Sequence, residues 1–193
     1  MFLSVVWLAL VLPGNAAARW PTPAGGPSAS GDPEVLFTFD DGPHGKHTPA
    51  VLDELAKRGA TAIFFWVSWR LNHGDVAVNR EIVLRTVREG HLVANHTINH
   101  PNLCTISEAE AAVEIDGNGA EFERATGLPM LLFRAPYGAH CKRLERMLAD
   151  RSLEHIHWDI DPQEWRHHNT TRTANFIIIT LKRLDGRAIV SLH

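Results

Sequence analysis

The stretch FTFDDGP, residues Phe37–Pro43, decides the fold that this sequence predicts. The apolar residues in and before it are typical of a buried strand. That strand ends on two neighbouring carboxylates, Asp40 and Asp41, and Gly42-Pro43 then favours a turn. Two acids at the end of a buried strand repel each other and lose solvation, so a cation, an arginine or a shared proton has to compensate them. For the two acids alone, a solvated turn with Asp41 capping the next helix is the alternative.

Composition narrows the class of protein. The chain has 193 residues, of which 45% are hydrophobic and 21% charged, and its net charge is -3. These values are ordinary for one globular domain with a substantial core. No basic stripe is present, so nucleic acid and anionic membrane surfaces are poor candidate partners. The 12 histidines are the one unusual count, and they raise the question of a bound metal.

The first 33 residues predict export rather than fold. Residues 2–12 form an apolar run that is too short to span a bilayer, and Ala16-Ala17-Ala18 offers a cleavage site. We therefore expect a signal peptide over residues 1–18, a secreted or cell-envelope location, and no stable membrane insertion after processing. The missing Lys or Arg before the run is atypical of such a signal. Residues 19–33 are rich in Pro, Gly, Ser and Ala and predict a flexible linker, so the folded domain should occupy residues 34–193.

Strand and helix patterns alternate from residue 34 onward. The expected strands are residues 35–39, 61–67, 91–95, 130–135, 154–160 and 187–192. The expected helices are residues 48–58, 76–89, 108–126, 142–150 and 171–184, with a loop at 68–75 and a kink or break at Asp116–Gly119. This alternation predicts an α/β fold with a parallel sheet, in which ligands bind at the carboxyl ends of the strands. The polar clusters of the sequence fall at those ends.

Two histidines in the segment HTINHP, His96 and His100, are candidate metal ligands. They would share one face if the segment turned helically. Neutral imidazoles bind zinc well, and two of them with one carboxylate leave open positions for water, as in a catalytic metal site. A His pair of this spacing is common on exposed helices, so the interpretation depends on the acids at residues 40 and 41.

The segment FRAPYG, residues 133–138, adds a cation and a turn. Arg134 ends an apolar strand, and a guanidinium there can hold a carboxylate in one orientation and keep it ionised. Pro136 and Gly138 shape a turn that could aim the backbone N–H of Tyr137 at a developing oxyanion. A routine surface ion pair is the alternative for Arg134.

Two further segments follow the last strands. In HWDIDPQEW, Asp161 comes just after a strand and Trp165 follows in the loop, where it could line an apolar pocket or stack on a sugar; ordinary packing is its alternative. The segment IVSLH ends on His193, which beside an acid could serve as a general acid near neutral pH. A frayed terminal residue without a role is the alternative.

The sequence contains two cysteines, Cys104 and Cys141. Both follow segments that carry candidate site residues. Export would place them in an oxidising compartment where they could pair. Two unpaired thiols packed as small apolar groups are an equal alternative.

Taken together, these five segments resemble the polysaccharide deacetylase family, the NodB-homology domain of carbohydrate esterase family 4. The resemblance covers about Val35–His193. It implies a distorted, incomplete (β/α) barrel with parallel strands. Because relatives usually continue past the last histidine, it also implies that the last β/α elements are missing.

The resemblance further implies an activity, a cofactor and residue roles. The activity is the removal of N-acetyl groups from GlcNAc-containing glycans, peptidoglycan or chitin-type, through a metal-activated water with an Asp base and a His acid. The metal is a divalent ion, usually zinc, although the same ligands admit cobalt, nickel or manganese. The implied roles are metal ligation by Asp41, His96 and His100, general base for Asp40, orientation of that base by Arg134, an oxyanion contact from Tyr137, general acid for His193, tuning of that acid by Asp161, and substrate contacts from Trp165 and Leu192.

Three other functions remain open at this point. The same site could cleave O-acetyl esters on a polysaccharide such as xylan. A chain that stops at His193 could instead be a catalytically impaired, glycan-binding remnant. The metal site could also be purely structural. The expected partner in the first two cases is an acetylated polysaccharide or oligosaccharide.

Overall fold

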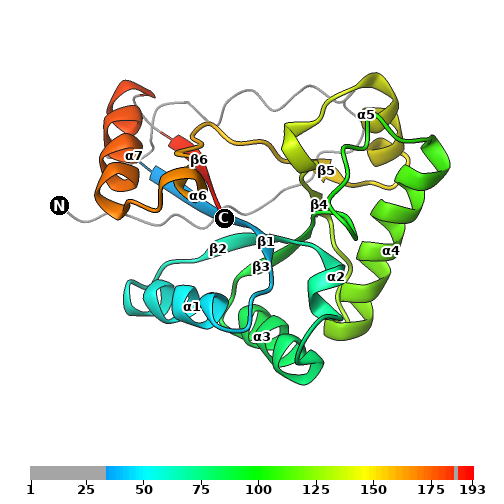
Figure 1. Cartoon of the computed structure of the whole chain (residues 1–193), viewed down its shortest axis with the longest axis horizontal. Coiled ribbons are helices and arrows are strands. Elements are labelled where there is room, and N and C mark those ends of the chain that lie inside the picture. Colours follow the sequence, from blue (N-terminus) through cyan, green and yellow to red (C-terminus); the bar gives the residue numbers. More distant parts are fainter. Residues whose placement is uncertain (1–33, 185–186) are drawn as a thin grey trace. The chain divides into compact units, whose positions relative to one another are not determined.

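The computed structural model describes residues 34–184 and 187–193, so the predicted signal peptide and linker lie outside the described residues. The strands, in chain order, are β1 (Glu34–Gly42), β2 (Ala62–Trp66), β3 (Leu92–Asn95), β4 (Leu132–Phe133), β5 (Glu154–His155) and β6 (Arg187–Leu192). The helices are α1 (His47–Lys57), α2 (Ser68–Leu71), α3 (Val76–Arg88), α4 (Glu108–Thr126), α5 (Lys142–Ala149), α6 (Glu164–His167) and α7 (Thr170–Leu184), with a 3₁₀ turn at Pro136–Gly138. The strand order is β5-β4-β3-β2-β1-β6 (Figure 1). None of these helices combines the length and the hydropathy that crossing a membrane requires.

The chain forms two compact units. The larger unit comprises residues 39–156, and the described part of the smaller one comprises residues 34–38, 157–184 and 187–193. Strand β1 contributes its first half to the smaller unit and its second half, with both acids, to the larger one.

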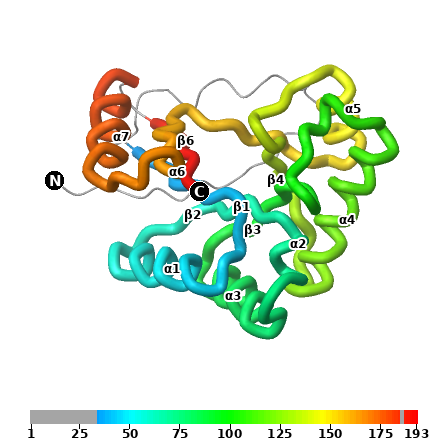
Figure 2. Tube along the Cα trace, in the orientation of Figure 1, coloured from blue at the N-terminus to red at the C-terminus, as the bar shows by residue number. Residues whose placement is uncertain are grey.

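The larger unit is built on parallel strands with helices outside them. Every residue of β2 is buried, as expected for a strand covered on both faces. Strand β2 pairs in parallel with β3 from Ile63↔Leu92 to Trp66↔Asn95, and β4 pairs in parallel with both β3 and β5. Helix α3 packs against both α1 and α4 (Figure 2). The predicted fold class, an incomplete (β/α) barrel with parallel strands, is confirmed.

The break expected at Asp116–Gly119 is wrong, because α4 continues through these residues to Thr126. Gly117 allows a close approach to the loop after β3. A Cβ on Gly117 would lie 2.6 Å from Cδ1 of Ile98. The fully buried Asn118 between the glycines donates to Asn95 Oδ1 at 3.0 Å and accepts from the backbone N–H of Ser68 at 2.7 Å. Packing here overrides the low helix propensity of glycine.

The segment 68–75 also differs from the loop that the sequence predicts. Its first residues form the short helix α2, whose first backbone N–H is the one bound by Asn118. The strand expected over 154–160 is shorter than predicted, because β5 ends at His155. Ile160 forms a single parallel bridge with Val190 in the smaller unit.

The two cysteines form a disulfide, with their Cα atoms 6.1 Å apart. The bond joins the segment that follows His100 to the one that follows the 3₁₀ turn. The core beneath it packs α4 and α5 against β4 and includes the buried residues Leu103, Ile115, Phe133 and Leu144. Of the two alternatives for the thiols, the structure therefore shows the paired one.

The smaller unit has its own core. Helix α7 packs on β6 through the buried side chains of Ile177, Leu181 and Val190. The hydroxyl of Thr38 in β1 donates to the carbonyl of Val190 at 2.8 Å. These contacts fix the end of β6, and therefore the position of the last residues of the chain within this unit.

Candidate active site

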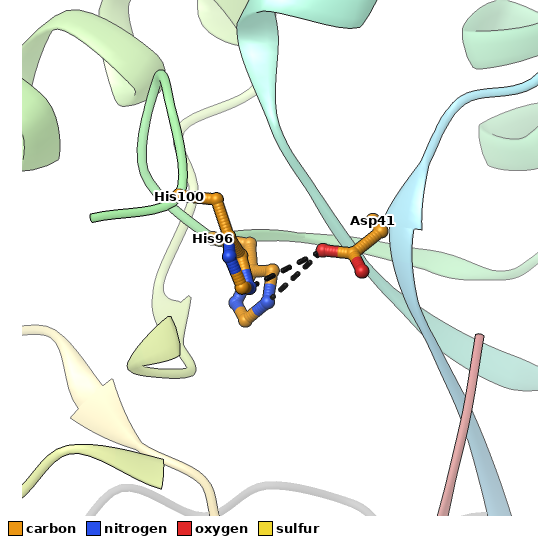
Figure 3. A group of neighbouring side chains, drawn as sticks. All are labelled: Asp41, His96 and His100. Carbon is orange, nitrogen blue, oxygen red and sulfur yellow. Dashed lines mark ion pairs between the residues drawn. The ribbon is translucent and has the colours of Figure 1, made fainter. Parts of the chain in front are cut away.

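Asp41, His96 and His100 bring three metal-binding atoms together in the larger unit. Figure 3 shows both imidazole rings turned toward the same oxygen of Asp41. Asp41 Oδ1 lies 3.6 Å from His96 Nε2 and 3.4 Å from His100 Nε2, and each ligand atom lies within 4.8 Å of the others. Two ligand atoms each bound about 2.1 Å from one tetrahedral zinc ion would lie about 3.4 Å apart. The spacing therefore fits a shared divalent metal.

The two histidines reach this position without a helix. Residues 96–100 form an irregular loop, in which Thr97 and His100 have φ values of 71° and 62°. The Asn95 side chain accepts from the backbone N–H of Thr97 at 2.9 Å, and the Thr97 hydroxyl accepts from that of His100 at 3.0 Å. The carboxylate of Glu114 on α4 accepts from the backbone N–H and from the side-chain amide of Asn99, each at 2.8 Å. The helical face that the sequence predicts is thus replaced by a loop fixed by side chains.

The tautomer of His96 follows from its backbone partner. Its Nδ1 lies 2.7 Å from the carbonyl oxygen of Arg134, which can only accept, so Nδ1 carries the proton. The lone pair of Nε2 then faces Asp41. Burial lowers the pKa of His96, which favours the neutral ring that a metal ligand needs.

Asp40 and Arg134 form a buried ion pair beside these ligands. The guanidinium Nη1 donates to Asp40 Oδ1 at 2.7 Å, and the two side chains are 0% and 4% exposed. The Arg134 Nε donates to the carbonyl of Ile156 at 3.2 Å, and the guanidinium stacks on Phe65 at 4.1 Å. Burial lowers the pKa of Arg134, and the charge of Asp40 opposes that effect. Asp40 is therefore held in one orientation, and its charge is felt by His96.

Tyr137 lies at the mouth of the same region. It occupies the 3₁₀ turn with a left-handed backbone, φ 61°. Its exposed ring lies edge-on to that of His100, with 4.6 Å between the ring centroids. Asp41 is a further left-handed residue, with φ 64°. Such conformations cost energy in non-glycine residues and cluster at functional sites. Here they turn the end of β1, the histidine loop and the 3₁₀ turn toward one cleft.

That cleft has a volume of about 430 Å³ and lies wholly in the larger unit. It is large enough for a sugar residue and its substituents. Three of its residues belong to none of the five segments: Val67, and Trp69 and Arg70 of α2. Its lining residues are Asp41, Val67, Trp69, Arg70, Asn99, His100 and Tyr137.

A buried histidine supports the turn that carries Tyr137. His155 Nε2 accepts from the backbone N–H of Ala135 at 3.3 Å, so its Nδ1 carries a proton and donates to Glu145 Oε1 at 2.8 Å. Burial, with the positive charges of His140 and Arg134, lowers the pKa of His155 from 6.5 to about 4. Sequence reasoning missed this pair, because neither residue belongs to a segment with recognisable chemistry.

We expect His155 to make stability depend on pH. Its pKa is lower in the folded than in the unfolded chain, so the unfolded chain binds the extra proton and stability falls as pH drops from about 6.5 to about 4. That difference corresponds to about 3 kcal/mol. Urea unfolding between pH 7.5 and pH 4 should show this fall in the wild type and a shallower one in His155→Gln, whose amide can keep both hydrogen bonds.

The comparison with His155→Gln separates this histidine from other titrating groups. Burial raises the pKa of Glu145, which acts in the opposite direction and remains in both proteins. Parallel stability profiles for the wild type and the variant would contradict the assignment.

The remaining candidate residues lie in the smaller unit. His193 Nδ1 lies 3.5 Å from Glu164 Oε1, which also accepts from the backbone N–H of His193 at 2.5 Å. The Trp165 ring lies edge-on to that of His193, 6.3 Å between centroids. The Oδ1 of Asp161 accepts from the backbone N–H of Gln163 at 2.9 Å. Leu192 is half-buried at the end of β6.

Glu164 is thus the carboxylate that contacts His193, and sequence reasoning assigned it no role. Burial raises the pKa of Glu164, but the hydrogen bonds from His193, a backbone hydrogen bond and the charge of His193 together lower it below its ordinary value. Its place in the sequence, directly before Trp165, was the available signal. The structure brings Asp40, Asp41, His96, His100, Arg134 and Tyr137 together in the larger unit, and Asp161, Trp165, Leu192 and His193 in the smaller one.

Known proteins resemble this chain over most of its length. A chitooligosaccharide deacetylase from Sinorhizobium fredii is 37% identical over 169 residues, which are 86% of this chain and 74% of that protein. A peptidoglycan-N-acetylglucosamine deacetylase from Bacillus cereus is 30% identical over 75% of this chain, and the match spans about half, 51%, of that protein. The solved structure of a family 4 carbohydrate esterase from Streptomyces lividans, in complex with acetate, matches with a TM-score of 0.72 at 30% identity, over 82% of this chain and 78% of that one.

The family assignment follows from these matches and from a family model. Residues 28–155, which include every candidate residue of the larger unit, match the model of the polysaccharide deacetylase family. The fold, the two acids at the end of β1 and the histidine loop agree with that match. This chain therefore belongs to the polysaccharide deacetylases, the hydrolases of carbohydrate esterase family 4.

Proposed function

We propose that this protein removes N-acetyl groups from GlcNAc-containing glycans with the help of one divalent metal ion. The observation that carries the proposal is the placement of the Asp40–Arg134 ion pair beside a three-ligand cluster at an open cleft. Relatives named as chitooligosaccharide and peptidoglycan deacetylases support a glycan N-acetyl group as the substrate.

Asp41, His96 and His100 would hold the metal, and zinc is the ion we expect. Their ligand-atom spacing and the tautomer of His96 fit such an ion. When bound, it would supply a Lewis acid that polarises the acetyl carbonyl and makes a water nucleophilic near neutral pH. Cobalt, nickel or manganese would also be accepted by these ligands.

Asp40 would act as the general base. Its carboxylate can take a proton from the attacking water, and the guanidinium of Arg134 holds it in one orientation through a hydrogen bond. The backbone N–H of Tyr137 would donate to the negative charge that develops on the carbonyl oxygen. The hydrogen bond from Ala135 to His155 would keep the turn that carries Tyr137 in place.

His193 would donate a proton to the leaving amine. Amides resist hydrolysis partly because the amine is a poor leaving group, so a separate acid is needed. Glu164 contacts the ring of His193 and would orient it, whereas the tuning of His193 by Asp161 stays a prediction. Trp165 and Leu192, which belong to the smaller unit with His193, would contact the substrate.

A metal-exchange experiment tests the proposal. We expect the protein as purified to contain about one zinc per chain, and a chelator to reduce acetate release from chitotetraose by at least about 100-fold. Adding back one equivalent of zinc should restore it. Elemental analysis and enzymatic acetate detection on the same samples measure both quantities.

Matched substrates separate this proposal from its rivals. Faster cleavage of an O-acetylated xylo-oligosaccharide than of chitotetraose would favour the esterase. Binding of oligosaccharide without acetate release from either substrate would favour the glycan-binding remnant. Acetate release that persists at full rate in metal-free protein would contradict the metal-dependent mechanism.

We also propose that the chain is exported. The apolar run at residues 2–12 and the disulfide between Cys104 and Cys141 both suit passage into an oxidising compartment. Mass spectrometry of the mature chain would identify cleavage near residue 18, and an intact N-terminus would contradict the predicted signal.

A further inference from the structure

The cleft beside the metal ligands contains a cation that the deacetylase mechanism does not use. Arg70 of α2 lines this cleft together with Asp41, His100 and Tyr137. Within residues 34–184 and 187–193, Arg70 belongs to no ion pair, and its buried Nε atom has no hydrogen-bond partner. A charged donor at an open cleft without an acid of its own is suited to bind an anion from outside.

Other basic groups lie near Arg70. Burial lowers the pKa of His44 most, and His47, Arg70 and Lys46 lie close enough to His44 to lower it further. Asp41 is the acid of the cleft lining, and ligation of a divalent ion would neutralise its charge. Basic side chains close to a cleft can attract anionic substrates even though the whole chain carries -3.

The Arg70 side chain is also held in an orientation that suits a carboxylate. Its guanidinium stacks on the Trp69 ring with Cζ 4.7 Å from the centroid. A stacked guanidinium keeps its N–H groups in the plane of the fork, where they can donate to both oxygens of a carboxylate. The Trp69 side chain is 37% exposed, which leaves apolar surface available to a sugar ring.

Helix α2 is fixed to the histidine loop and is therefore preorganised. The backbone N–H of Trp69 donates to the carbonyl of Ile98 at 3.2 Å, and that of Ser68 donates to Asn118 at 2.7 Å. The side chain of Asn79 donates to the carbonyl of Arg70 at 2.8 Å. A ligand that reaches Arg70 would not have to order this helix, so little affinity is lost to conformational entropy.

From this geometry we propose that Arg70, stacked on Trp69, binds a carboxylate substituent on a sugar next to the acetylated GlcNAc, and so makes the site prefer an anionic glycan over a neutral one. The proposal rests on the deacetylase function proposed above and narrows its substrate. A chitin-type chain offers Arg70 no charge. The carboxylate of a peptidoglycan strand comes either from the lactyl ether of the muramic acid residue or from an attached peptide.

Binding measurements test this independently of turnover. The zinc-loaded Asp40→Asn protein is titrated calorimetrically with four ligands: chitotetraose, a GlcNAc–muramic acid tetrasaccharide with free lactyl carboxylates, its neutral methylamide, and the same glycan carrying a stem peptide. We expect the carboxylate form to bind about 10-fold more tightly than the methylamide. In Asp40→Asn/Arg70→Gln this preference should fall to less than twofold, and Arg70→Lys should keep part of it.

The matched control is Arg124→Gln, which removes the same charge from an exposed position on α4 outside the cleft and should retain the full preference. A preference that appears with the free lactyl group assigns the carboxylate to the sugar, and one that appears with the stem peptide assigns it to the peptide; either supports the proposal if Arg70→Gln removes it. Equal binding of charged and neutral ligands, or a preference that survives Arg70→Gln, overturns it. Because no outcome requires acetate release, a failed deacetylase assay would not be mistaken for a failed Arg70 site.

Discussion

Asp40→Asn is expected to reduce acetate release from chitotetraose by about 10²–10⁴-fold while the protein keeps its zinc. The amide has the shape of the carboxylate but cannot accept a proton from water. The metal ligands Asp41, His96 and His100 are untouched, so the ion should remain. Acetate detection and elemental analysis of the same preparation provide the two measurements.

Asp41→Asn is the matched comparison for this substitution, because it changes the neighbouring residue in the same way. It should weaken zinc retention, since a neutral amide is a poorer ligand than a carboxylate. If Asp40→Asn lost its zinc and Asp41→Asn kept it, the roles of the two acids would have to be exchanged. Unchanged activity in Asp40→Asn would remove Asp40 from the mechanism.

Arg134→Met is expected to lower the free energy of unfolding by about 3–5 kcal/mol and to abolish most of the activity. The side chain of Asp40 is 4% exposed, so its charge stays buried near the metal ligands when the guanidinium is removed. Breaking one half of a buried ion pair costs this much because the other charge loses its compensation. Urea unfolding at pH 7.5 measures the loss.

Two controls test whether the loss of stability in Arg134→Met comes from a buried, uncompensated charge. Arg146→Gln breaks an ion pair with Glu108 in which both side chains are more than half exposed, and it should cost less than about 1 kcal/mol. The double variant Arg134→Met/Asp40→Asn removes both charges and should be more stable than Arg134→Met alone. A double variant that is less stable than either single variant would contradict the buried-charge explanation.

The fold and the main ligands were predictable because they depend on local signals. Alternating strand and helix patterns require a parallel sheet, and the carboxyl ends of its strands are where Asp41, His96 and Arg134 occur. Each of these residues directly follows or ends an apolar run, so its position can be read without knowing its neighbours. That is why three separate segments could be expected to meet.

Other features depend on contacts between distant residues and could not be predicted from local patterns. Helix α4 continues through Gly117 because the side chain of Ile98 occupies the space above it, and Asn118 satisfies backbone groups some 50 residues earlier in the chain. Glu164, the first residue of α6, contacts His193, whereas Asp161 accepts from the backbone N–H of Gln163. Helix propensities and residue spacing do not predict these contacts.

At Asp41, Thr97 and His100, the left-handed backbone places the stability of the fold in conflict with the metal site. Glycine would relax the strain at each of them, most of all at the β-branched Thr97, but would remove a ligand or the hydroxyl that holds one. Substitutions that stabilise the fold and spare the site therefore have to be made elsewhere in the chain, since these three positions offer improvement only at the expense of the site.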